Sequence, residues 1–183
     1  MSSVLGFTQI ELLLTLGLAA LAAGMATPTL ASLYADGCLS RHVNTLADTL
    51  QLARSEAVRR QQPVYACPIR ARNDLSYQGC RNDADWSDGI LLYVDSPTGS
   101  SARYDAGEAI ARVILHAPGS PRRISISGPG VLSFTPDGQT TLSSLTALHF
   151  QDSSGQCRTL QLSPWGSITA CGQQGTATCP SCP

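Results

Sequence analysis

Lysine is absent from this sequence of 183 residues, so all 12 of its basic side chains are arginines. Charged residues make up only 14% of the chain, aromatic residues only 5%, and the formal net charge is −1. A chain this close to neutrality has no overall field that would attract nucleic acid or an acidic surface. The motifs G-x-S-x-G, H-E-x-x-H and the P-loop are also missing, and the three histidines are scattered surface or strand candidates: His42, His116 and His149. We therefore expect no enzymatic activity and no cofactor.

Cysteine spacing suited to a metal site is missing as well, although the chain has seven cysteines. Its one C-x-x-C pair lies at the very end without a thioredoxin-like βαβ context, so it indicates a terminal disulfide rather than a redox centre. Two other pairs, Cys67 with Cys80 and Cys157 with Cys171, have the spacing of disulfide-closed loops. With the terminal pair, Cys179 and Cys182, they make six disulfide candidates. This usage indicates an oxidising, extracytoplasmic compartment, with Cys38 as the candidate unpaired thiol.

The acidic stretch NDADWSDG places Asp83, Asp85 and Asp88 in one loop, and oxygen-rich loops of this kind bind calcium. The EF-hand pattern is incomplete, because glycine does not stand at the sixth loop position and the closing glutamate is missing. The stretch therefore favours a solvated acidic turn, and we predict no metal ligands.

A long apolar stretch near the N-terminus is the most prominent feature that the sequence does contain. From Ile10 to Leu33 it is broken only by Glu11, a few Thr and Ser, two Gly and one Pro. About 20 apolar residues span a bilayer as a helix. A cleaved secretory signal or a plain single-span anchor are the alternatives, but the six residues before Phe7 lack the basic side chains of a secretory signal. We expect a membrane-embedded helix, in which an acid such as Glu11 usually marks function.

Beyond this stretch the apolar pattern becomes amphipathic and then changes its period. Apolar residues four and three positions apart define one helical face, which ends near Gln61-Gln62-Pro63: Leu39, Val43, Leu46, Leu50, Ala53 and Ala57. From Pro63 onward, short runs rich in β-formers alternate with Gly, Pro, Asn and Asp, as in PVYACPIR, GILLYVD and CRTLQLS. The sequence therefore predicts an α+β fold, in which a long N-terminal helical spine packs on a C-terminal antiparallel β-sheet or β-sandwich domain. The tail GQQGTATCPSCP is predicted to be a loop.

The N-terminal stretch GFTQIELLLTLG resembles the signature of type IV pilins and type II secretion pseudopilins, roughly G-F-T-x-x-E-L. Four further stretches are similar to the GspH/FimT group of minor pilins and pseudopilins. They are LADTLQLARSEAVRRQQPV before Cys67, WSDGILLYVD, LSFTPDGQT and SITACGQQG. Together with the N-terminal signature they cover most of the chain.

This resemblance implies a class III leader, which a prepilin peptidase cuts between Gly6 and Phe7 before methylating the new N-terminus at Phe7. The cleavage would create an ammonium at Phe7, one helical turn from Glu11. An ion pair between them, within one subunit or between neighbours, would reduce the cost of a carboxylate in lipid and help to set filament register. The implied parts are a leader (1–6), a transmembrane and filament-core helix (7–34), the amphipathic half of that helix (35–62) and a globular β-rich pilin domain (63–183).

The resemblance also implies a location and a set of partners. We expect a single-pass protein of the bacterial inner membrane with a periplasmic globular domain, which is later built into a type IV pilus. There it would initiate assembly or form the tip complex. Its partners would be other minor and major pilins or pseudopilins, the prepilin peptidase and the inner-membrane assembly platform. A GspH-like pseudopilin of type II secretion is an alternative.

A pilus-borne DNA receptor for natural transformation is a further alternative, because some members of the FimT group bind DNA with basic residues near the C-terminus. Between Ile124 and Pro183 this chain has only one arginine, Arg158. The candidate DNA contacts therefore lie elsewhere, and they are Arg59, Arg60, Arg122 and Arg123. Phosphate contact needs several converging cations, so solvated faces and a helix C-terminus explain these arginines more simply.

Overall fold

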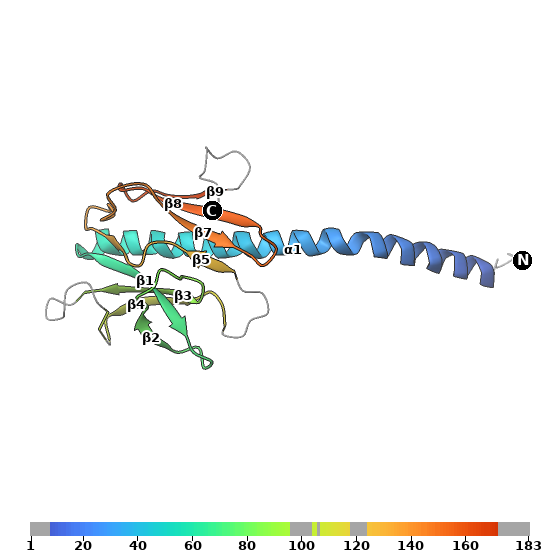
Figure 1. Ribbon diagram of the computed structural model, residues 1–183, viewed down its shortest axis with the longest axis horizontal. Helices are drawn as coiled ribbons and strands as arrows, with labels where there is room; N and C mark the ends of the chain where they lie inside the picture. Colours follow the sequence, from blue (N-terminus) through green and yellow to red (C-terminus); the bar gives the residue numbers. More distant parts are fainter. Residues whose placement is uncertain (1–7, 96–103, 106, 118–123, 172–183) are drawn as a thin grey trace, which may run out of the picture. The chain divides into compact units, whose positions relative to one another are not determined.

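The computed structural model describes residues 8–95, 104, 105, 107–117 and 124–171 (Figure 1). The chain divides into two compact units, Met1–Gly37 and Cys38–Pro183. One helix, α1 (Gln9–Arg60), runs through both units, and it makes up the whole of the first unit after Thr8. In the part of the chain that the structure describes, no helix is both long enough and apolar enough to cross a membrane.

The C-terminus of α1 ends as the sequence predicts, and the local chemistry explains why. Gln61 adopts a left-handed conformation with φ 55°, and the Gln62 amide donates to the Ala57 carbonyl at 3.3 Å. This is the six-to-one hydrogen bond of a helix C-cap, which satisfies a carbonyl that the last turn would otherwise leave open. Pro63 then prevents the helix from continuing.

Two antiparallel sheets follow the helix in the second unit. The first has the order β2-β1-β3-β4, with β6 beside β1. Its strands are β1 (Val64–Ala71), β2 (Tyr77–Cys80), β3 (Gly89–Val94), β4 (Ala109–Ile114) and β6 (Leu132–Phe134). The second sheet has the order β5-β7-β8-β9, with strands β5 (Ser125–Ser127), β7 (Thr146–Gln151), β8 (Cys157–Leu162) and β9 (Ile168–Cys171). The predicted α+β architecture of a helix packed on antiparallel sheet is confirmed.

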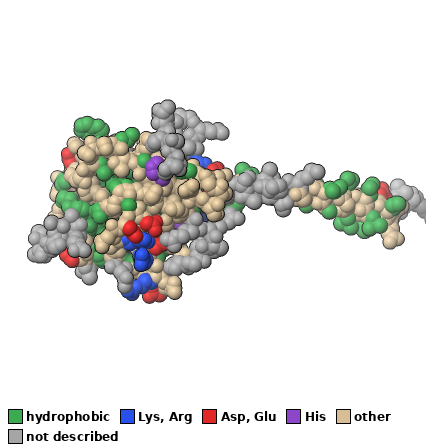
Figure 2. Space-filling model, viewed as in Figure 1, with side chains coloured by type: hydrophobic (Ala, Val, Ile, Leu, Met, Phe, Trp, Pro, Cys, Tyr) green, Lys and Arg blue, Asp and Glu red, His purple; other side chains and the backbone are tan. Residues whose placement is uncertain are grey.

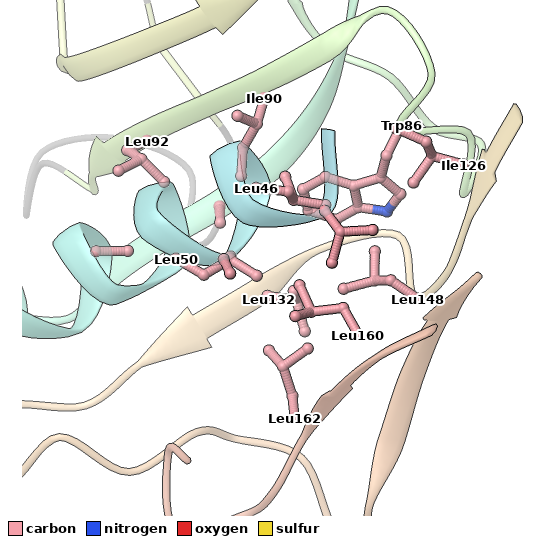
Figure 3. Close-up of a cluster of buried hydrophobic side chains, with 14 of the residues drawn as sticks. Leu46, Leu50, Trp86, Ile90, Leu92, Ile126, Leu132, Leu148, Leu160 and Leu162 are labelled. Atoms are coloured by element: carbon pink, nitrogen blue, oxygen red, sulfur yellow. The ribbon is translucent and has the colours of Figure 1, made fainter. Parts of the chain in front are cut away.

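The main core lies between the second half of α1 and both sheets (Figure 3). The helical face read from the sequence is confirmed, since all six of its residues are at most 2% exposed. Successive side chains of β3 point to opposite faces of the sheet. Ile90 and Leu92 therefore belong to this core, whereas Leu91 and Tyr93 belong to a second cluster. The first sheet is therefore apolar on both faces, and a shift of one residue in β3 would exchange the two sets.

Candidate assembly site

The N-terminus of α1 carries the residue that the sequence singles out for assembly, Glu11. The Thr8 amide and the Thr8 hydroxyl both donate to Glu11 Oε2, at 3.4 and 3.3 Å, and the Glu11 amide donates to Thr8 Oγ1 at 3.4 Å. This reciprocal arrangement is a capping box, which satisfies amides that the first turn leaves open. The carboxylate is thereby held back toward the chain end, beside the positive end of the helix dipole. The signal was present in the sequence as T-x-x-E, but the sequence reading assigned Glu11 only to ion pairing.

Large apolar side chains surround the helix in the first unit and face solvent (Figure 2). Seven of them are between 55 and 77% exposed: Ile10, Leu12, Leu13, Leu14, Leu16, Leu18 and Leu21. A helix that is apolar on all sides is stable only when other apolar groups cover it. The first unit therefore leaves a large apolar surface uncovered in the single chain. The expected cleavage site, between Gly6 and Phe7, lies outside the described residues.

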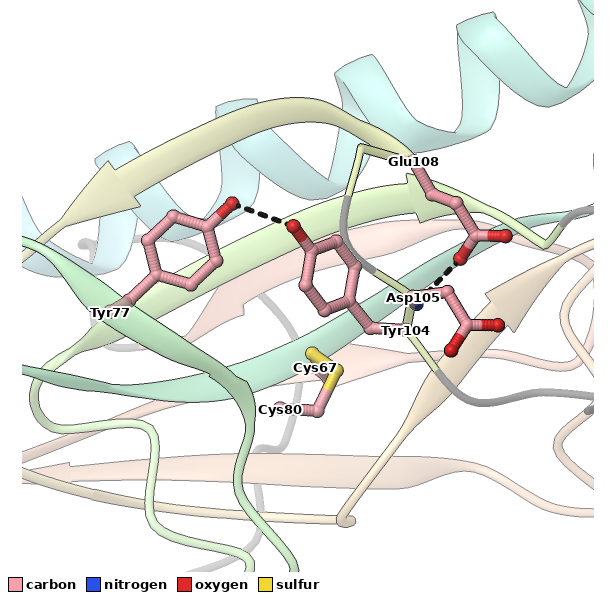
Figure 4. Close-up of a disulfide and its surroundings, with 6 residues drawn as sticks. All are labelled: Cys67, Tyr77, Cys80, Tyr104, Asp105 and Glu108. Atoms are coloured by element: carbon pink, nitrogen blue, oxygen red, sulfur yellow. Dashed lines mark hydrogen bonds between the residues drawn. A yellow bond between two sulfur atoms is a disulfide. The ribbon is translucent and has the colours of Figure 1, made fainter. Parts of the chain in front are cut away.

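A disulfide joins β1 to β2, between Cys67 and Cys80, with Cα atoms 5.5 Å apart (Figure 4). It lies in the second apolar cluster beside Tyr77 and Tyr104, whose hydroxyls are 3.1 Å apart. Burial raises the pKa of the neighbouring Tyr93 to about 12. The pairing read from this cysteine spacing is therefore present in the structure.

The other candidate cysteines are placed only in part. Cys157 and Cys171 each take part in a disulfide, but the structure shows no bond between the two, so their expected pairing with each other is not confirmed. Cys38 has a free thiol. Cys179 and Cys182 lie outside the described residues.

Removing the Cys67–Cys80 bond should destabilise the second unit. The double substitution Cys67→Ala with Cys80→Ala frees a loop of 13-residue separation. It should lower the free energy of unfolding by about 3 kcal/mol, because the unfolded chain regains loop entropy. Urea unfolding of the full chain in detergent measures this, and Cys38→Ala is the matched control that should change stability by less than about 0.5 kcal/mol. Equal stability of the two variants would contradict a structural role for the bond.

The basic side chains proposed as DNA contacts do not form a free cationic site in the described residues. Arg59 Nε donates to Glu56 Oε1 at 3.1 Å, and Arg60 Nε donates to Glu56 Oε2 at 2.7 Å. Hydrogen bonds from these two guanidinium groups lower the pKa of Glu56 to about 2. Arg122 and Arg123 lie outside the described residues. On the face shown in Figure 2, basic side chains are dispersed and do not form a continuous patch.

In the aspartate loop, the side chain of Arg81 pairs with the carboxylates that were considered as calcium ligands. The Arg81 guanidinium forms ion pairs with Asp83, with Asp85 at 3.3 Å and with Asp88 at 3.4 Å. The hydrogen bond from Arg81 is the main cause that lowers the pKa of the Asp83 carboxyl. The prediction of a solvated acidic turn is wrong for Asp88, which is 5% exposed. Among the described residues there is no cluster of side chains suited to a metal ion.

Two of the scattered histidines come together, which the sequence did not reveal. His42 on α1 and His116 after β4 stack with ring centroids 4.3 Å apart. His116 is 5% exposed, its Nδ1 lies 2.8 Å from the Ser87 carbonyl, and the Ile124 amide donates to its Nε2 at 3.3 Å. The expectation of a surface or strand residue is therefore wrong for His116, which joins three loops as a buried polar group. His149 lies on β7, as a strand residue.

An amphipathic helix covered by two antiparallel sheets, with a capped glutamate at the start of the helix, defines a pilin-like class of structural protein. The family described as type II transport protein GspH matches residues 42–166, more than half of the chain. The chain therefore belongs to the GspH family of minor pilins and pseudopilins. Proteins of this family are structural subunits of type IV pili or type II secretion systems rather than enzymes, so the family implies partners in such machinery and a membrane or pilus location.

Three solved structures are similar to this chain in fold. Two crystal forms of the type IV minor pilin FimU from Pseudomonas aeruginosa (strain PAO1) are similar, with TM-scores of 0.49 and 0.50 and 20% sequence identity. The similarity covers 72% of this chain and 90% and 87% of the FimU chains. The minor pseudopilin EpsH from the type 2 secretion system of Vibrio cholerae has a TM-score of 0.44 and 10% identity, over 72% of this chain and 94% of EpsH. No curated protein matches the chain.

Proposed function

We propose that this chain is a minor pilin that enters a type IV pilus, where it initiates assembly or forms part of the tip complex. The observation that carries the proposal is the capped Glu11 at the start of an apolar helix whose large side chains are exposed. A subunit with such a helix gains stability when neighbouring helices cover it. The GspH family membership supports the same class of role.

The proposed processing step turns the capping box into an assembly device. A prepilin peptidase removes residues 1–6, which leaves a methylated ammonium at Phe7. In the structure the Glu11 carboxylate already lies 3.4 Å from the Thr8 amide, one residue further along the chain. An ammonium at Phe7 is therefore within reach of the same carboxylate, in its own subunit or in a neighbour. The pairing neutralises both charges as the helix passes from the inner membrane into the filament core.

The partners in this proposal are other pilins, the prepilin peptidase and the inner-membrane assembly platform. The subunit is inserted once in the inner membrane through residues 7–34, and its globular unit is periplasmic. The disulfide at Cys67 and Cys80 supports an oxidising compartment for that unit. A pseudopilin of type II secretion would use the same leader and helix. Deletion of the gene separates the two roles, because loss of surface pili supports the pilus and loss of protein secretion with intact pili contradicts it.

The mature N-terminus tests the processing step directly. Cleavage after Gly6 leaves 183 − 6 = 177 residues. Intact-mass and N-terminal peptide analysis should find a chain that begins at methylated Phe7. Gly6→Val should leave most of the protein at full length, because a branched side chain obstructs close approach of the peptidase to the scissile bond. Leu5→Val is the matched control and should be processed normally. Cleavage at a small-residue site beyond the apolar stretch would instead identify a secretory signal.

A further inference from the structure

A groove of about 720 Å³ opens between the last turns of α1 and the turn that precedes β9. Its helical wall consists of residues three and four positions apart, so it is a face of α1 that the sheets leave uncovered. The lining residues that matter are Arg54, Val58 and Arg59 on α1, and Gly166, Ser167 and Ile168 at the turn and the start of β9. Val58 is 45% exposed, and Trp165, next to the lining residue Gly166, is 72% exposed. Exposed tryptophan and arginine side chains are the types that most often anchor interfaces.

Two cations line this groove, and Arg59 is ion-paired with Glu56, so Arg54 is the one that is left for a ligand. Its Nε–H donates to the Gly138 carbonyl at 2.9 Å, and its Nη2 donates to the Trp165 carbonyl at 3.4 Å. Among the described residues no carboxylate lies within 4.0 Å of it, and the Asp137 carboxylate nearby accepts from the Thr135 hydroxyl instead. A guanidinium has five N–H donors and stays protonated in proteins. Arg54 therefore keeps a full positive charge and donors beyond the two that these carbonyls accept.

The backbone around Arg54 is packed so that the guanidinium is held in place. Gly138 and Gly166 have φ values of +78° and +77°, which L side chains rarely adopt. A Cβ added to Gly166 would lie 2.1 Å from the Gly138 carbonyl oxygen and 3.0 Å from Arg54 Nε. The two turns therefore contact each other directly through glycine, with Arg54 bonded to both. A cation held in this way loses little conformational entropy when it binds a ligand.

We propose that this groove docks a segment of a neighbouring filament subunit that presents an aspartate or glutamate beside an apolar side chain. The carboxylate pairs with Arg54, and the apolar side chain covers Val58 and Ile168. Charge complementarity favours a single carboxylate as the ligand of Arg54. A nucleic acid backbone would need several converging cations, but the nearby Arg59 and Arg60 are already paired with Glu56. The proposal rests on the proposed role of the chain as a filament subunit.

Site-specific photocrosslinking in cells that assemble the filament tests this docking. A benzophenone amino acid replaces Val58 in the full chain, and the matched control carries it at Leu52, which is 43% exposed on α1 but does not line the groove. The expected result is an adduct at position 58 with another filament subunit, mapped by mass spectrometry to a peptide that contains Asp or Glu. Arg54→Gln keeps a donor for the Gly138 carbonyl but removes the charge, and it should reduce the adduct about tenfold.

Several outcomes would overturn the docking proposal. They are equal adducts at positions 52 and 58, an adduct peptide without an acidic residue, an adduct with nucleic acid or lipid, or no adduct in filaments that contain the subunit. Arg54→Lys, which keeps the charge, should restore most of the adduct, and failure to do so in a folded chain also contradicts the proposal. Absence of the chain from isolated filaments, measured in the same samples, contradicts the proposed function instead. The two failures are therefore distinguishable.

Discussion

Alanine in place of Glu11 should exclude the protein from filaments while leaving leader cleavage intact. The substitution removes both the acceptor of the Thr8 hydrogen bonds and the proposed partner of the Phe7 ammonium. A hydrogen bond to a charged group contributes about 1.5–3 kcal/mol, so we expect incorporation to fall at least about tenfold. The measurement is the amount of the subunit in sheared, purified filaments relative to its amount in the membrane.

Two further substitutions separate the cap from the charge. Glu11→Gln can still close a capping box, because glutamine serves at this position, but it cannot neutralise an ammonium. Thr8→Ala removes the hydroxyl of the cap and keeps the carboxylate. If pairing drives assembly, Glu11→Gln should be nearly as defective as Glu11→Ala, and Thr8→Ala should assemble. The reverse order would show that Glu11 serves only to begin the helix.

The helix and most strands could be predicted from the sequence because their signals are local. The buried face of α1 follows from a spacing of three and four, and its end follows from Gln61-Gln62-Pro63. Strand β2 was missed, since Tyr77–Cys80 is only four residues long and contains a glycine. Its place beside β1 depends on the pairing of Cys80 with Ile69 across the hairpin, which the four residues of β2 do not indicate by their own pattern.

The groove at Arg54 could not be predicted from the periodicity of the sequence, because it depends on contacts between distant residues. The two carbonyls that hold its guanidinium lie 84 and 111 residues away along the chain. A backbone carbonyl gives no signal in the sequence, because every residue carries one, and even the LSFTPDGQT stretch that contains Gly138 does not indicate a contact with Arg54. The stacked histidines, His42 and His116, are likewise brought together only by the fold. By contrast, the capping box at Thr8 and Glu11 was readable from sequence, since its donors and acceptors lie three residues apart.

The two tryptophans should differ widely when each is changed to alanine. Trp86 is fully buried in the main core, and its Nε1–H donates to the Pro129 carbonyl at 2.7 Å (Figure 3). Trp86→Ala leaves a large cavity between α1 and the sheets, so the free energy of unfolding should fall by about 3–5 kcal/mol. Trp165 is 72% exposed, and only its backbone carbonyl accepts from Arg54. Trp165→Ala should therefore stay within about 0.5 kcal/mol of the parent chain.

Urea unfolding of the full chain in mild detergent, followed by circular dichroism, measures both effects. With a slope of about 1–3 kcal/mol per molar urea, the midpoint for Trp86→Ala should fall by at least about 1 M, whereas that for Trp165→Ala should hardly move. Equal shifts would mean that Trp86 is not enclosed as the structure has it. Trp165→Ala can also be used in the crosslinking test of the groove. If this variant is stable and still enters filaments, it isolates the contribution of the Trp165 side chain to docking. A reduced adduct from position 58 in that chain would then report lost contact with the partner rather than lost folding.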